Sequence, residues 1–131
     1  MKAIYFNHWE KEDGYKVVDI KDDLKAFYEL LHCNLIDIAV RSIGGINYNI
    51  IIDDEGFYHK PCVLGASNPY DQDCILMNSL LVTGSPDGEG NLTSLTDDDI
   101  NNIMNSMHPF FYKEDGQLKG RDLLKIDWMQ Y

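Results

Sequence analysis

Two alternating runs of β-branched residues joined by a pair of glycines constrain this chain more than any other feature. They lie in the stretch LIDIAVRSIGGINYNIIIDDEG, residues 35–56. Every second residue in each run is apolar, which places those side chains on one face of a sheet. Gly44 and Gly45 can adopt the positive backbone angles that a tight hairpin turn requires. We therefore predict a central β-hairpin over 35–56 that ends in an acidic turn, Asp53 to Gly56.

A chain of 131 residues, 44% of them hydrophobic, is long enough to bury one core. We predict a single domain over 1–131, with residues 108–131 as a C-terminal extension packed on it. No run of about 18 apolar residues and no basic, apolar leader is visible, so neither membrane insertion nor export is expected. The cysteines favour a reduced, cytoplasmic protein over a disulfide framework or a zinc site, because they are far apart and form no CxxC pattern. They are Cys33, Cys62 and Cys74.

Four further elements have clear local signals. The expected strands cover residues 2–8 and 15–20, and the expected helices cover 22–33 and 97–107. Asp22 and Asp23 favour a helix start because acidic side chains cap free amides and suit the helix dipole. Thr96 and Asp99 resemble a capping box at the start of the second helix. Pro109 is expected to stop that helix, because proline cannot continue its hydrogen bonding.

The stretches between these elements are less regular. Residues 57–60 are expected to form a short strand, and 62–72 a loop rich in Gly, Ser, Asn and Pro. Residues 74–83 are apolar throughout, which predicts a strand buried on both faces, with a short helical turn as the alternative. The tail is expected to turn at 113–116 and to end in a strand or short helix. The predicted fold class is therefore α+β, an antiparallel sheet with both helices on one face.

The net charge is −11, and its distribution is uneven. Between Pro61 and Tyr112 there is no Lys or Arg, so that segment carries a net charge of −7. Such a surface repels phosphate and disfavours direct binding of DNA or RNA through a basic patch. It could attract a basic protein or a cation, or it could serve solubility alone. The candidate contact residues are Asp87, Glu89, Asp97, Asp98 and Asp99.

The order of several motifs resembles a family of small bacterial and phage proteins, the domain of unknown function numbered 3846. The resembling motifs are an early D-x-L-x-x-F-x-x-L helix from Asp22, I-G-G-x-x-Y-x-I from Ile43, the DDEG turn from Asp53 and LTSLTDDDI from Leu92. The resemblance implies a small α+β domain without assigned activity or catalytic residues. It also implies a place on chromosomes, plasmids and phages of Gram-positive bacteria, and hence the cytoplasm of a bacterial host. The tail from His108 lies outside the usual pattern.

Several polar groups are candidate sites. The DDEG turn could hold a metal or a general base, but hairpin ends use Asp and Gly for backbone reasons. His59 and Cys62 could be a base and a nucleophile, yet no oxyanion loop is evident. Asp87 and Asp98 match the ends of a calcium loop, although leucine occupies the position that requires glycine. No metal or cofactor is therefore predicted. A pocket could be lined by Arg41, Lys60, His8, Trp9 and Tyr70.

Three functional hypotheses follow. The first is a non-enzymatic accessory protein of a phage or mobile element that binds a host protein with a basic surface, such as a defence component, through its acidic segment. The second is a protein that binds a small molecule or nucleotide signal in the pocket above. The third, an enzyme, has no motif in its support. Self-association is open in all three.

Overall fold

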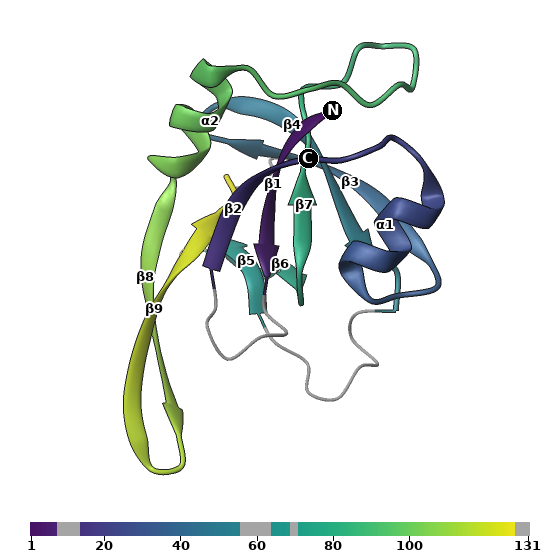
Figure 1. Ribbon diagram of the computed structural model, residues 1–131. Coiled ribbons are helices and arrows are strands. Elements are labelled where there is room, and N and C mark those ends of the chain that lie inside the picture. Colours follow the sequence, from purple (N-terminus) through teal and green to yellow (C-terminus); the bar gives the residue numbers. More distant parts are fainter. Residues whose placement is uncertain (8–13, 56–63, 69–70, 128–131) are drawn as a thin grey trace.

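The computed structural model describes residues 1–7, 14–55, 64–68 and 71–127. The strands are β1 (Lys2–Asn7), β2 (Gly14–Asp19), β3 (Ile36–Ile43), β4 (Ile46–Asp53), β5 (Leu64–Asn68), β6 (Asp71–Met77), β7 (Leu80–Val82), β8 (Met107–Glu114) and β9 (Gln117–Lys125). The helices are α1 (Leu24–Leu31) and α2 (Asp97–Met104). These elements form an α+β fold, as predicted (Figure 1).

The first sheet has the strand order β2-β1-β7-β4-β3, and all its pairings are antiparallel. The predicted central hairpin is present as β3 and β4, closed by the pair Ile43 and Ile46. Gly44 and Gly45 have φ angles of 59° and 84°, the positive values that a two-residue turn requires. The strand β7 lies between β1 and β4 and joins two sequence-local hairpins into one sheet.

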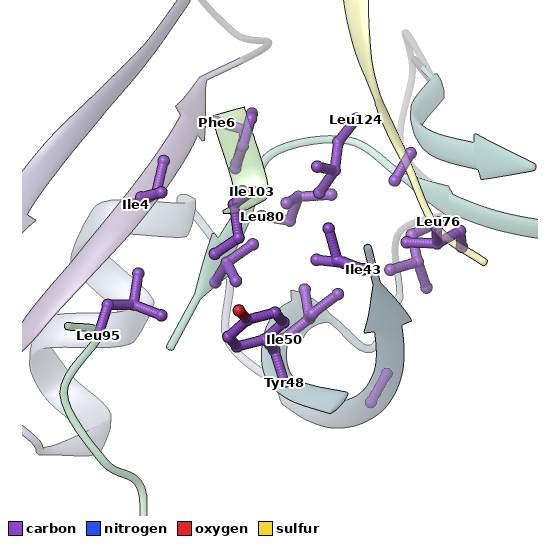
Figure 2. Packing of buried hydrophobic residues seen from close by; sticks show 14 residues of the cluster. Ile4, Phe6, Ile43, Tyr48, Ile50, Leu76, Leu80, Leu95, Ile103 and Leu124 are labelled. Carbon is purple, nitrogen blue, oxygen red and sulfur yellow. The ribbon is translucent and has the colours of Figure 1, made fainter. Parts of the chain in front are cut away.

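The two helices pack on opposite faces of this sheet, so the prediction that they share a face was wrong. The α1 residues Phe27 and Leu31 pack with Tyr5 of β1, whereas Ile103 of α2 packs with Ile4 of β1. Neighbouring residues of a strand point to opposite faces, so these contacts place the helices on either side. The larger cluster also includes residues of the second sheet, such as Leu76 and Leu124 (Figure 2). Alternation alone cannot show which face a later helix will cover.

The second sheet has the order β6-β5-β9-β8. It was not predicted as a separate sheet, and its β5 strand lies where the sequence predicted a loop. The β5 strand pairs antiparallel with β6 and parallel with β9. The apolar stretch 74–83 is also not one strand, because Asn78 adopts a left-handed φ of 64° and separates β6 from β7. The predicted strand at 57–60 lies outside the described residues.

Both helices start close to their predicted caps. Asp23 caps α1 by accepting a hydrogen bond from the Ala26 amide at 2.8 Å. Thr96 and Asp99 form the predicted capping box of α2. The helix ends at Met104 instead of near 107, because the chain has already turned into β8 at Met107. Pro109 therefore lies within a strand and does not stop the helix.

The tail forms a two-stranded arm, which we define as residues 107–125 of β8 and β9. Its turn, at the predicted place, has positive φ at Asp115 and Gly116. Figure 1 shows the arm extending away from the body of the molecule. At its base, Leu123, Leu124 and the following Ile126 are almost completely buried. The residues after 108 therefore supply part of the hydrophobic core.

Candidate functional site

Side-chain hydrogen bonds connect α2 to the central hairpin. The Tyr48 hydroxyl donates to Asp99 Oδ1 at 3.1 Å. The Asn102 side-chain amide donates to the Tyr48 hydroxyl at 3.0 Å and to the Ile43 carbonyl at 2.9 Å. Since Tyr48 is completely buried, these bonds satisfy a polar group that would otherwise be costly inside the protein. This contact holds α2 on the hairpin.

Asp99 and Asp97, two of the five candidate contact residues, have partners on other parts of the chain. Asp99 Oδ2 accepts a hydrogen bond from the Thr96 amide at 2.9 Å and so completes the capping box. Burial raises the pKa of Asp99, but the hydrogen bonds from Thr96 and Tyr48 outweigh it and hold that pKa below its ordinary value. Asp97 lies 3.3 Å from the Lys2 ammonium group. Both carboxylates are directed at groups of the same chain.

Asp87 and Glu89 lie on the connection between β7 and α2. Asp87 Oδ1 accepts hydrogen bonds from the amides of Glu89 and Asn91, at 2.8 and 3.2 Å. These bonds, chiefly the one from the Glu89 amide, lower the pKa of Asp87. The carboxylate is thus partly used to shape the turn, although the residue is exposed.

Glu89 and Asp98 differ from the other three. Both are exposed, and within the described part of the chain neither carboxylate has a hydrogen-bond or ion-pair partner. The connection that carries Glu89 crosses the same end of the molecule as α2, at the top of Figure 1. We call Asp87, Glu89 and Asp98 the acidic end.

The DDEG turn has the structural role that its composition favours. Asp53 Oδ1 accepts a hydrogen bond from the Glu55 amide at 2.9 Å, and the Asp53 side chain is buried beneath the turn. Burial, and secondarily the charge of Asp53, raise the pKa of the neighbouring Cys33 thiol to about 11. Such a thiol is protonated at neutral pH and is a poor nucleophile. His59 and Cys62 lie outside the described residues.

The predicted pocket is represented only by Arg41, because Lys60, His8, Trp9 and Tyr70 lie outside the described residues. Arg41 Nη1 donates to the Val40 carbonyl at 2.9 Å, on the outer edge of β3. Among the described residues, no three His, Cys, Asp or Glu side chains are grouped so that they could hold a metal ion.

The arm was only partly anticipated from the sequence. Phe111 and Leu118 are 66% and 71% exposed, the highest values among the exposed large hydrophobic residues of the described chain. The signal was present in FFYKEDGQLKG, residues 110–120, where two β-prone runs flank Asp-Gly. The sequence predicted the turn at 113–116, but the alternative of a strand or short helix covered only residues 123–131, and no element was predicted for 117–122.

Comparison with protein families matches residues 6–108 to the model of a domain of unknown function, DUF3846. The chain belongs to this family. Neither the curated proteins nor the solved structures contain a significant match. The matched region includes the hairpin and α2, with the contact between Tyr48 and Asp99 and the neighbouring Gly44. Most of the arm lies beyond the match.

The described part of the chain also contains no helix with the length and apolar character needed to cross a bilayer. Its longest helices have 8 residues, whereas a span requires about 20.

Proposed function

We propose that this protein is a non-enzymatic binding module that recognises a basic surface of a host protein through its acidic end. The observation that carries the proposal is that this end combines free carboxylates with an ordered backbone. Glu89 and Asp98 are exposed and unpaired within the described chain. No Lys or Arg lies between them in the sequence to neutralise them.

The backbone between β7 and α2 is held by specific bonds although it contains no helix or strand. The Gly84 amide donates to the Thr93 carbonyl at 2.8 Å, and the Leu95 amide donates to the Lys2 carbonyl at 2.9 Å. The Thr93 hydroxyl donates to the Ser85 carbonyl at 2.9 Å. A segment that is ordered before binding loses less conformational entropy when a partner docks. Charge on such a segment also raises the association rate with a partner of opposite charge.

The occurrence of the family on phages and plasmids, which the motif resemblance implies, supports an accessory role toward a host component such as a defence protein. The charge distribution supports a protein partner over a nucleic acid, because a phosphate backbone would be repelled by the same carboxylates.

The test is capture of a partner from lysate of a Gram-positive host at low salt, followed by measurement of its affinity for variants. The variant Glu89→Gln with Asp98→Asn removes two unpaired charges without touching the capping box. Two exposed ion pairs contribute up to about 1 kcal/mol each, so we expect affinity to fall about tenfold. The loss should shrink as salt is added.

A matched control removes one Asp and one Glu carboxylate at α1 instead. Asp22→Asn with Glu29→Gln changes exposed residues at α1 and should leave affinity within about twofold, since neither residue belongs to the acidic end. Equal weakening by both pairs would show that only net charge matters. That outcome, or capture of no partner, would refute the proposal.

A further inference from the structure

The outer part of the arm has no neighbouring strand within the described chain. The β9 strand pairs with β5 only at its base, where Leu124 and Lys125 lie opposite Ala66 and Ser67. Beyond that point β8 and β9 pair only with each other. A two-stranded ribbon is marginal by itself in water and gains stability when another strand extends it.

The free edge of β8 has a defined set of outward-facing backbone groups. The Lys125 amide donates to the Ser106 carbonyl at 3.0 Å, so Ser106 faces β9. Because both backbone groups of a residue point to the same side and successive residues alternate, Pro109, Phe111 and Lys113 face away from β9. Pro109 therefore costs no bond to β9, since its missing donor faces outward. The backbone groups of Phe111 and the Lys113 amide are left to bind another strand. The Pro109 carbonyl lies 3.2 Å from His108 Nδ1, and its second lone pair is left to accept from another strand.

One face of the arm carries Leu124, Phe111 and Leu118, together with the charged residues Lys113 and Asp122. Phe111 lies opposite Gly120, and Lys113 lies opposite Leu118, so Phe111 and Leu118 are diagonal neighbours on the same face. At the base the same face carries Leu124, which is completely buried in the core. Toward the turn, Phe111 and Leu118 are about two-thirds exposed. The free edge and these uncovered apolar side chains thus belong to the same segment.

We propose that two copies of this chain associate through β8, with the two strands antiparallel about a two-fold axis at Phe111. Each Phe111 then exchanges backbone hydrogen bonds with the partner's Phe111, and each Lys113 amide donates to the carbonyl of the partner's Pro109. The two arms become one four-stranded ribbon. Phe111 and Leu118 of both copies gather on one face and shield each other from water.

The charges on the arm fit this register. Lys113 lies opposite the partner's Pro109, and the partner's Asp122 follows on the next strand of the same face. Two strand spacings are about 10 Å, a gap that the extended lysine and aspartate side chains can span. An axis at Lys113 would instead place like charges opposite each other, which is unfavourable. The arm as a whole carries a net charge of +1 within a chain of −11, so two acidic molecules repel each other least at this place.

The β3 edge of the first sheet is occupied by contacts within the chain. On β3, the Ile38 amide donates to Asp37 Oδ1 at 2.9 Å, and the Val40 carbonyl accepts from Arg41. Farther along, the Ser42 carbonyl accepts from the Asp127 amide at 2.7 Å. These contacts occupy groups that a docking strand would need. The experiment below compares the shorter β2 edge with the β8 edge.

The experiment measures the mass of the full chain by sedimentation equilibrium over a concentration series. The wild type should approach about twice the 15.1 kDa of one chain. Leu118→Lys should stay near 15.1 kDa, because it places a charge on the buried face of the ribbon. The matched control Leu24→Lys alters an exposed apolar residue of α1 and should behave as the wild type.

Charge reversal tests the register. Lys113→Glu should weaken the dimer severalfold at low salt, because the new carboxylate on each copy repels the partner's Asp122. Adding Asp122→Lys to that variant should restore the dimer. Failure of this second exchange to restore association would overturn the proposed alignment.

Hydrogen exchange of the wild type gives a readout without substitutions. The outward-facing amides of Phe111 and Lys113 should gain protection in proportion to the dimer fraction, whereas the outward-facing amide of Val17 on β2 should not. A chain that remains monomeric at all concentrations would refute the proposal. So would a dimer that Val17→Pro dissociates while Leu118→Lys leaves it intact, since that result would assign the contact to β2.

Discussion

At the scale of single residues, the two adjacent glycines of the hairpin turn have different roles. Gly44 and Gly45 both adopt positive φ in the hairpin turn. A Cβ atom on Gly45 would meet nothing within 4 Å, whereas one on Gly44 would overlap the Asn102 side chain. The Asn102 amide is held in place by Ile43 and Tyr48, so it cannot give way without losing hydrogen bonds. Gly44 is therefore required by the helix contact as well as by the turn.

This difference predicts unequal costs for two similar substitutions. Gly45→Ala should lower the free energy of unfolding by about 1–2 kcal/mol, the cost of a left-handed backbone for an L-residue. Gly44→Ala should cost about 3 kcal/mol, because it also disturbs two hydrogen bonds of about 1 kcal/mol each. Urea denaturation of both variants measures the two costs. Equal costs would show that the Asn102 contact contributes nothing.

The buried Cys33 thiol allows a prediction about pH and reactivity. With its pKa raised to about 11, only about one molecule in a thousand carries the thiolate at pH 8, against about a quarter for an ordinary thiol near 8.5. Alkylation of the Cys33 peptide in native protein at pH 8 should therefore be at least about a hundredfold slower than in urea. Native labelling should accelerate as pH rises toward 11. A native rate equal to the urea rate would contradict this environment.

At the scale of elements, α2 shows how a short helix is stabilised by its first turn. It has only 8 residues and places acidic Asp97, Asp98 and Asp99 at its start, with Thr96 as cap. Short helices are marginal alone, so the cap and the contact with Tyr48 matter more than intrinsic propensity.

Removal of the cap should be measurable in the whole protein. Thr96→Ala should destabilise the fold by about 1 kcal/mol, because the Asp99 amide loses its acceptor. For a chain of this size that corresponds to a fall in melting temperature of roughly 3–5 °C. Thr96→Ser keeps the hydroxyl and should retain most of the stability in thermal unfolding followed by circular dichroism. If serine behaved as alanine does, the cap would not be the cause.

The elements predicted from the sequence are those with local signals, namely the central hairpin, the capping box and the arm's turn. The β5 strand was missed because its sequence, LGASN, has no alternating apolar pattern. Its partners make it a strand: Ala66 is fully buried between β6 and β9, and the Asn68 side chain donates to the Ile126 carbonyl at 2.9 Å. Contacts between positions 58 residues apart leave no trace in a local window.

The partners of the acidic candidates could not be predicted from the sequence. Charge counting selected five acidic residues on the connection after β7 and in the first turn of α2. It could not separate Asp97 and Asp99, which have intramolecular partners, from Glu89 and Asp98, which do not. Such partners depend on the fold, since Lys2 is 95 residues from Asp97 in sequence.

At the scale of the whole molecule, the two hydrophobic clusters lie on opposite faces of one sheet and both include β7. Leu81 belongs to the cluster beneath α1, and Leu80 and Val82 belong to the cluster beneath α2. All three residues are completely buried.

This three-residue strand also sets how the protein loses its structure. On one side β7 pairs with β1, and on the other with β4, so the hairpins β1–β2 and β3–β4 share a sheet only through it. Neither hairpin can separate without exposing residues from both clusters at once. We therefore expect no partly unfolded intermediate in which one hairpin survives. Both hydrophobic clusters should unfold in a single cooperative transition. The smallest strand thus makes the unfolding of the domain cooperative.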